Sequence, residues 1–105
     1  MEWDSKIKGK EYYLNSKLEF EGEYLFNKKW NGKGYDKNGN IIYEIKNGNG
    51  FVKEYNDEGN LIFEGEYLNG KRWNGKFRLI DYWNKPKFEG ELINGERKGY
   101  SSNLS

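Results

Sequence analysis

The sequence contains no cysteine and no histidine among its 105 residues, and it also lacks threonine, alanine and glutamine. Without cysteine the chain can form no disulfide and no reactive thiolate, and zinc sites built on cysteine or histidine are excluded. Nucleophile pairs that depend on a histidine base are excluded for the same reason. We therefore expect this protein to bind no metal ion and no cofactor.

The chain has little net charge and no long apolar run. Its formal net charge is +1, which gives no strong electrostatic reason to bind nucleic acid or an anionic membrane. No apolar run approaches the length of a transmembrane segment, and the opening residues 1–4 do not resemble a signal peptide. We expect a soluble cytoplasmic protein.

Aromatic residues are abundant although hydrophobic residues as a whole are scarce. Only 34% of residues are hydrophobic and 33% are charged, but 18% are aromatic: four Trp, nine Tyr and six Phe. Disordered segments are poor in aromatic residues. The composition therefore predicts one folded domain, too polar for a thick core.

A short motif recurs along the chain. The segment Phe20–Tyr24 (FEGEY) returns at 63–67 and, with leucine at its end, at 88–92, while a degenerate copy begins at Tyr43. The leading aromatic residues at 20, 43, 63 and 88 are therefore 23, 20 and 25 residues apart. Repeats of about this length indicate a solenoid-like array of small units. We divide the chain into an N-terminal cap (1–17), four repeats (18–40, 41–60, 61–87 and 88–100) and a tail (101–105).

Asn-Gly occurs seven times, at 31, 38, 47, 49, 69, 74 and 94, and this dipeptide is typical of tight hairpins. Alternating runs between these positions predict strands. The predicted strands cover 18–26, 41–46, 51–55, 61–68, 76–83 and 88–93, with a cap strand around 11–14. The fold class we predict is all-β, an elongated single-layer antiparallel meander with two strands per repeat.

Strand alternation gives the predicted sheet two different faces. In the third repeat Phe63, Gly65 and Tyr67 point one way, and Glu64 and Glu66 point the other. A glycine at a strand centre weakens a sheet unless a neighbouring aromatic ring lies across it. We therefore expect an aromatic face arranged around glycine, and an opposite face of Glu and Lys.

The segment 63–72 (FEGEYLNGKR) resembles the core of a MORN repeat, whose pattern is aromatic-x-Gly-x-aromatic-x-x-Gly, and the similarity extends from about residue 18 to about residue 100. The tryptophans before Asn-Gly at Trp30 and Trp73, and the loss of glycine at Ile45, are closer to the bacterial antitoxin-type variant of this repeat. The resemblance implies an elongated antiparallel sheet. It also implies a role as scaffold, adaptor or membrane-associated module, or as a neutraliser of a toxin.

Carboxylates are the remaining candidates for catalysis. Glutamate pairs flank the motif glycine at 21/23, 64/66 and 89/91, a spacing of about 7 Å that an inverting glycosidase could use. However, the pairs are identical copies, whereas acid–base catalysis needs two carboxylates in different environments. We expect ion pairs with Lys33, Lys53, Lys76 and Arg78 instead, and no enzymatic activity. The acidic turns at 36–40 and 56–60 lack the full spacing of a calcium loop, so we interpret them as Asx turns.

Protein recognition has positive support, because an open sheet has free edges and Trp and Tyr anchor interfaces. We predict a non-enzymatic protein-binding module, a small inhibitor or neutraliser of a toxin or nuclease-type protein, acting through sheet edges and an aromatic face. The candidate contacts are Trp30, Trp73, Trp83, Tyr24, Tyr67 and Tyr82. The alternatives are a MORN-type scaffold at a membrane or the cytoskeleton, and single-stranded nucleic acid stacked on aromatic residues. A homodimer also remains open.

Overall fold

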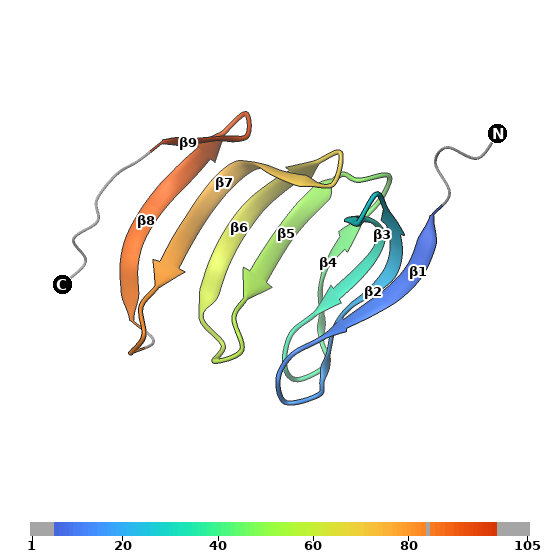
Figure 1. Cartoon of the computed structure of the whole chain (residues 1–105), viewed down its shortest axis with the longest axis horizontal. Helices are drawn as coiled ribbons and strands as arrows, with labels where there is room; N and C mark the ends of the chain where they lie inside the picture. Colours follow the sequence, from blue (N-terminus) through green and yellow to red (C-terminus); the bar gives the residue numbers. More distant parts are fainter. Residues whose placement is uncertain (1–5, 84, 99–105) are drawn as a thin grey trace.

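The computed structural model describes residues 6–83 and 85–98, and within them the chain forms nine β-strands and no helix. This confirms the all-β class (Figure 1). The strands are β1 Ile7–Tyr12, β2 Leu18–Leu25, β3 Lys28–Tyr35, β4 Ile41–Ile45, β5 Gly50–Tyr55, β6 Leu61–Leu68, β7 Lys71–Ile80, β8 Pro86–Ile93 and β9 Glu96–Lys98. The predicted tail and the first five residues of the predicted cap lie outside the described residues.

The strands form two antiparallel sheets, β1-β2-β3-β4 and β5-β6-β7-β8-β9, in which strands adjacent in sequence are neighbours. The regular ladder stops between β4 and β5, where a single isolated bridge joins Lys46 and Asn49. The molecule measures 51 × 32 × 19 Å. The prediction of one continuous single-layer ribbon is therefore not confirmed, because the described strands belong to two sheets.

Several strand boundaries differ from the prediction. No strand was predicted over β3 or β9, β7 covers Lys71–Ile80 instead of 76–83, and the first strand covers Ile7–Tyr12 instead of 11–14. Both Trp-Asn-Gly-Lys segments, at 30–33 and 73–76, lie inside strands. The error came from treating every Asn-Gly as a turn.

Six of the seven Asn-Gly dipeptides divide into two structural kinds, and the seventh, at 38, lies in the loop at 36–40. Those at 47, 69 and 94 are tight turns in which both residues have positive φ, as type I′ hairpins require. Those at 31, 49 and 74 lie outside these turns, and their side-chain oxygens accept hydrogen bonds from the backbone N–H groups of residues 47, 69 and 94, over 2.8, 3.1 and 2.9 Å. Each turn is thus fixed to the preceding unit, and this interlock also crosses the break between the sheets.

Loops of five residues join the strands at the opposite end of the molecule. They cover 13–17, 36–40, 56–60 and 81–85, and in each the first N–H donates to the fifth carbonyl over 2.8–2.9 Å. The loops begin seven residues before the leading aromatic residues at 20, 43, 63 and 88, so they are 23, 20 and 25 residues apart. The sequence repeat is therefore also a repeat of the backbone.

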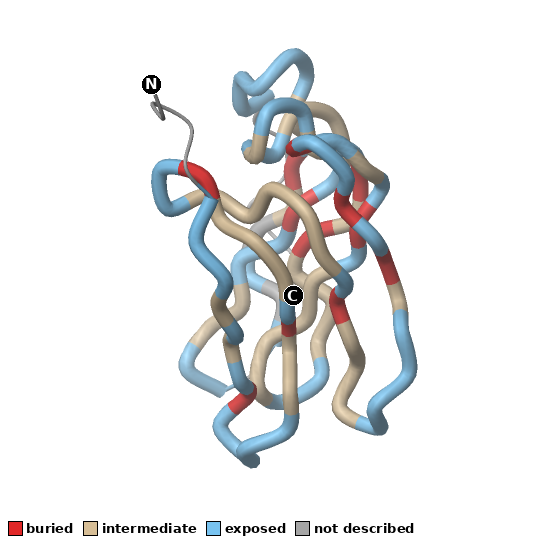
Figure 2. The backbone as a smooth tube through the Cα atoms, turned by 90° about the vertical axis from the view of Figure 1, so that its right-hand side faces the viewer, coloured by how far each residue is buried: buried red, intermediate tan, exposed pale blue. Residues whose placement is uncertain are grey.

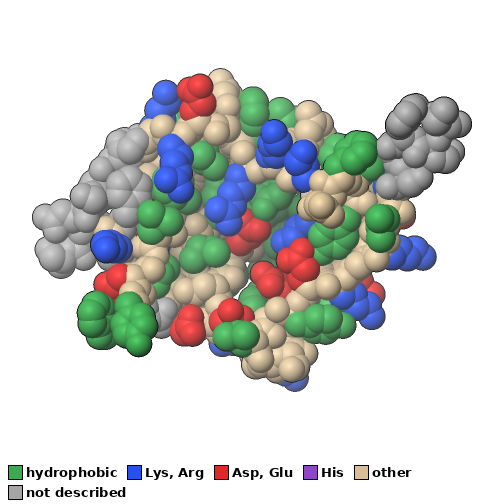
Figure 3. Space-filling view, in the orientation of Figure 1, with side chains coloured by type: hydrophobic (Ala, Val, Ile, Leu, Met, Phe, Trp, Pro, Cys, Tyr) green, Lys and Arg blue, Asp and Glu red, His purple; other side chains and the backbone are tan. Residues whose placement is uncertain are grey.

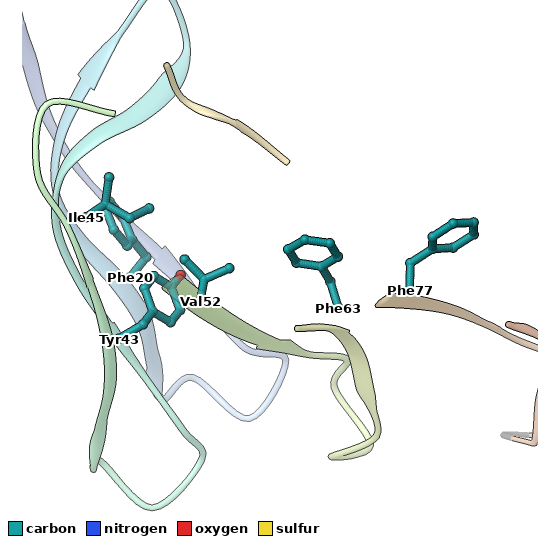
Figure 4. Close-up of a cluster of buried hydrophobic side chains, with 6 residues drawn as sticks. All are labelled: Phe20, Tyr43, Ile45, Val52, Phe63 and Phe77. Carbon is teal, nitrogen blue, oxygen red and sulfur yellow. The ribbon is translucent and has the colours of Figure 1, made fainter. Parts of the chain in front are cut away.

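The core runs across both sheets. Phe20 of β2 and Phe63 of β6 are completely buried, and they belong to one cluster with Tyr43, Ile45, Val52 and Phe77 (Figure 4). Buried positions are few and lie mostly along the strands, although Tyr13 of the first loop and Gly48 of a hairpin turn are also buried, and the rest of the turns and loops is mostly exposed (Figure 2). A chain with little hydrophobic residue content can therefore fold around a small aromatic core.

The motif glycine has the predicted role in one of its three copies. At Gly90 a Cβ would come within 2.7 Å of the Phe77 ring, so an aromatic ring lies across this glycine as predicted. A Cβ on Gly65 would instead overlap the carbonyl oxygen of Asn74 on the neighbouring strand, so glycine is required there by close backbone approach. The ring of Phe63 covers Gly75 on that neighbouring strand.

Candidate functional site

Two of the six candidate residues, Tyr24 and Tyr67, are half-buried and bonded within the molecule. The Tyr24 hydroxyl donates to Glu11 over 2.6 Å, and the Tyr67 hydroxyl donates to Glu54 over 2.8 Å. Their rings make edge contacts with the fully buried phenylalanines four positions earlier in the chain. Both tyrosines therefore have a structural role in closing the core.

The half-buried Trp30 and Trp73 pack on the tips of the next hairpins. A Cβ on Gly48 would lie 2.7 Å from the Trp30 ring, and a Cβ on Gly95 would lie 3.0 Å from the Trp73 ring. Each tryptophan also accepts a 2.8 Å hydrogen bond from that glycine N–H through its backbone carbonyl. These contacts explain why tryptophan stands before the interlocking Asn-Gly in both copies.

Tyr82 and Trp83 are placed differently, at the tip of the loop between β7 and β8. Their exposed fractions are 92% and 73%, and their rings meet edge to face with centroids 5.5 Å apart. The loop beneath them is fixed by Asp81, whose Oδ1 accepts the N–H groups of Trp83 and Lys85, both over 2.9 Å. These hydrogen bonds position the aromatic pair, whose side chains remain accessible.

The equivalent loops show that this backbone does not need aromatic residues. Asp36 and Asn56 occupy the position of Asp81, and their Oδ1 atoms accept the same two backbone N–H groups over 2.9–3.0 Å. The tip residues there are polar, Lys-Asn at 37–38 and Asp-Glu at 57–58. Polar residues therefore occupy the same positions on the same backbone, so the fold does not require aromatic residues at this tip.

A groove of about 520 Å³ lies beside the aromatic pair. Its lining residues come from two adjacent loops and the end of β7: Asn56, Glu58, Ile80, Asp81, Tyr82 and Trp83. At the end of the molecule where the β7–β8 loop lies in Figure 1, Figure 3 shows projecting hydrophobic side chains with acidic side chains nearby. An exposed aromatic pair next to a groove has the composition of an interface anchor.

A polar cluster at the junction of the two sheets was missed by the sequence analysis. The ammonium group of Lys29 lies 3.9 Å from Glu11 and 3.7 Å from Glu54, and it lies over the Phe20 ring at 5.0 Å. The side chains of Lys29 and Glu54 are each only 12% exposed. Arg72 pairs with Glu54 over 2.8 Å. These contacts join the first sheet to the second by charge as well as by the shared core.

Burial in this cluster shifts several pKa values. Burial raises the pKa of the Tyr43 and Tyr67 hydroxyls, and the nearby charge of Glu54 raises both further. Burial also raises the pKa of Glu19, although Lys29 acts in the opposite direction. All three groups therefore favour their neutral forms more than they would in water.

The repeated glutamate pairs are arranged as a salt-bridged surface. Glu21, Glu64 and Glu89 pair with Lys10, Lys53 and Arg78 over 3.8, 3.8 and 2.7 Å, and the side chains of all six are more than 40% exposed. The expected partners Lys33 and Lys76 lie opposite glutamates in the register, but they make no ion pair within 4 Å among the described residues. The second glutamates of the first two pairs, Glu23 and Glu66, instead accept hydrogen bonds from the side chains of Asn31 and Asn74, over 3.1 and 3.4 Å.

The outer strands of both sheets carry charge. In β1 the exposed Lys8 and Lys10 alternate along the strand, and all three residues of β9, Glu96–Lys98, are charged and exposed. Charged side chains on edge strands disfavour the addition of another strand. The exposed aromatic loop is therefore a better candidate for recognition than either of these strands.

Comparison with known proteins gives no family and no relative for this chain. No family model matches it, and neither the curated proteins nor the solved structures contain a match. In the part of the chain that the structure describes, no helix has the length and apolar character needed to cross a membrane.

Proposed function

We propose that this chain is a non-enzymatic protein-binding module built from MORN-like hairpin repeats, and that it acts as an inhibitor or neutraliser of another protein. The observation that carries the proposal is the loop at 81–85. Its backbone hydrogen bonds match those of two polar loops, yet its tip presents Tyr82 and Trp83 to solvent. Large exposed aromatic residues that the fold does not need are typical of binding anchors.

The MORN-like part of the proposal is supported by the backbone repeat. The interlock between Asn-Gly dipeptides continues from Asn31 through Asn49 to Asn74, and so passes the break between the sheets. Each unit consequently contacts its sequence neighbours, which is the organisation of repeat proteins. The toxin-neutralising role rests on the resemblance described above and on the exposed pair Tyr82 and Trp83.

Binding of single-stranded nucleic acid is less well supported. Base stacking needs free aromatic faces, but Lys29, Arg72 and Arg97 lie over the rings of Phe20, Phe63 and Phe77 at 4.7–5.0 Å. These three rings are also buried in the core, so no base can stack on them. A protein partner at the exposed loop requires no change in the core.

The test is capture of partners from nuclease-treated lysate of the native cells, followed by reconstitution of the complex from purified components. The bait is compared with the variant Tyr82→Ser/Trp83→Ser and with the matched variant Lys37→Ser/Asn38→Ser in the equivalent loop. The proposal expects a stoichiometric protein that is lost only with the first variant. It also expects affinity that changes little between low and high salt, because the anchor is aromatic.

Other outcomes would replace the proposal. Recovery of nucleic acid with affinity that falls steeply with salt would support the stacking alternative. Recovery of membrane or cytoskeletal material would support the scaffold alternative. Retention of the protein partner by Tyr82→Ser/Trp83→Ser would show that this loop is not the binding surface.

A further inference from the structure

A three-residue set accompanies the motif phenylalanine in two of the repeats. Glutamate stands nine residues before it, tyrosine four after and a basic residue nine after, which gives Glu11, Tyr24 and Lys29 around Phe20. The same offsets give Glu54, Tyr67 and Arg72 around Phe63. In both copies tyrosine donates to the glutamate, and the cation lies over the phenylalanine ring within 5.0 Å. The cation thus always has a carboxylate beside it.

The copy around Phe88 keeps the cation but lacks the acid and the hydroxyl. The same offsets place Leu79, Leu92 and Arg97 there, and the register pairs Leu79 with Phe88 and Leu92 with Arg97 as in the other copies. The guanidinium of Arg97 lies at 5.0 Å over the ring of Phe77 of β7, whereas the cations of the other two copies lie over the motif phenylalanines. No carboxylate lies within ion-pair distance of Arg97 in the described ranges 6–83 and 85–98.

The position that lost its carboxylate opens into a groove. Its volume is about 360 Å³, and its lining includes Ile62, Leu79, Leu92, Arg72, Arg78 and Arg97. Leu79 is 45% exposed. The volume is in the range of small-molecule sites, and the lining combines aliphatic side chains with guanidinium groups, which best match the geometry of a carboxylate. Arg72 and Arg78 are already paired with glutamates, which leaves Arg97 for a ligand.

We propose that this groove binds a small carboxylate carried on an aromatic or aliphatic body. The ligand carboxylate pairs with Arg97, as Glu54 pairs with Arg72 in the neighbouring copy over 2.8 Å. The ligand body lies on Ile62, Leu79 and Leu92, where an apolar group is removed from water. In the other copies a glutamate and a tyrosine of the chain itself stand beside the cation. These side chains indicate which chemical groups a ligand of the groove should carry.

The probe for the test is para-hydroxyphenylacetate, because it combines the phenol and the carboxylate of the two missing side chains. Its neutral amide is the matched control. Binding is followed by heteronuclear NMR at the backbone amides of Leu79, Leu92 and Arg97. We expect saturable shifts with half-saturation at roughly millimolar concentration, as is usual for so small a ligand. The amide should bind about tenfold more weakly or not at all, since it lacks the charge-assisted contact.

Variants of the groove make the test specific. Arg97→Gln should weaken binding of the acid about tenfold. Leu79→Glu restores the carboxylate of the other copies, so it should pair with Arg97 and abolish binding, whereas Leu79→Gln should stay within about threefold of the wild type. The NMR spectrum of each variant reports whether it is folded.

The outcome is independent of the proposed protein partner. Tyr82→Ser/Trp83→Ser changes a different surface and should bind the probe as the wild type does. Equal binding of acid and amide, no saturable binding, or undiminished binding to folded Leu79→Glu would each overturn the proposal. None of these results would affect the assignment of the aromatic loop as a protein-binding surface.

Discussion

The copies around Phe63 and Phe88 follow the same sequence pattern but differ in what fills the space above their strands. Around Phe63, the half-buried Glu54 is bonded to Tyr67 and Arg72, and the copy is closed by its own side chains. Around Phe88, leucines replace the acid and the hydroxyl, and the strands beside it lead into a loop with two exposed aromatic residues. The comparison teaches that the glycine and asparagine pattern fixes the backbone in both places. A few side chains then decide whether a copy is closed by its own glutamate and tyrosine or left open as a groove.

The largest expected difference lies in core packing. Phe63→Ala removes a completely buried ring and should lower the free energy of unfolding by about 3–5 kcal/mol. Leu79→Ala, at a position that is 45% exposed, should cost less than about 1 kcal/mol because the side chain is only partly withdrawn from water. Urea unfolding followed by tryptophan fluorescence measures both. Equal losses would contradict the distinction between a closed and an open copy.

The polar cluster should show the next largest difference. Glu54→Gln leaves the half-buried Lys29 and the Tyr67 hydroxyl with a weaker partner, so we expect a loss of about 2–3 kcal/mol. The matched change Glu89→Gln breaks an exposed pair with Arg78 and should cost less than about 1 kcal/mol. A tolerated Glu54→Gln would mean that charge does not join the two sheets.

Alkaline pH should affect the closed copies selectively. The pKa of the Tyr67 hydroxyl is raised by burial and by Glu54, so the folded state favours the neutral hydroxyl. The stability that this group adds is complete below its ordinary pKa of about 10, and it is lost as the pH rises toward the pKa of the group in the folded protein. The stability gap between wild type and Tyr67→Phe should therefore shrink above pH 10, by at most about 1.4 kcal/mol per pH unit. Unfolding curves at several alkaline pH values measure this, and Tyr82→Phe at the exposed loop should follow the wild type.

The smallest expected difference concerns the turn interlock, which is the same in both regions. Asn49 and Asn74 each accept one N–H from the next turn, over 3.1 and 2.9 Å. Alanine at either position should cost about 1 kcal/mol, the value of one ordinary hydrogen bond. Parallel unfolding measurements on the two variants would check this, and a much larger loss at Asn49 would show that the interlock is needed mainly at the break between the sheets.

Much of the fold could be predicted from the sequence because turn chemistry and strand alternation are local. The motif at Phe63–Tyr67 gave the correct burial of its phenylalanine and the exposure of Glu66. The two kinds of Asn-Gly could not be separated, since the role of Asn74 depends on a turn twenty residues later in the chain. The break after β4 also depends on tertiary packing.

The candidate site was predictable only in part for a similar reason. The residue type alone does not distinguish an aromatic side chain that packs within the fold from one that is exposed, so Trp30 and Trp83 were both predicted as contact residues. Alignment of the loops separates them, because only one of the three Asx loops has aromatic tip residues. The cluster around Lys29 was detectable as residues at constant offsets from the motif phenylalanine, a signal carried by spacing across several strands.

The most direct test exchanges the loop tip for that of the equivalent polar loop. The variant Tyr82→Lys/Trp83→Asn copies the Lys-Asn pair at 37–38 onto the same backbone. We expect its free energy of unfolding to stay within about 0.5 kcal/mol of the wild type, since exposed side chains are being exchanged. Its affinity for the captured partner, measured by calorimetric titration, should fall at least about a hundredfold, the effect of losing an anchor residue. A marked loss of stability, or unchanged affinity, would contradict the account that this copy departs from the repeat in order to bind.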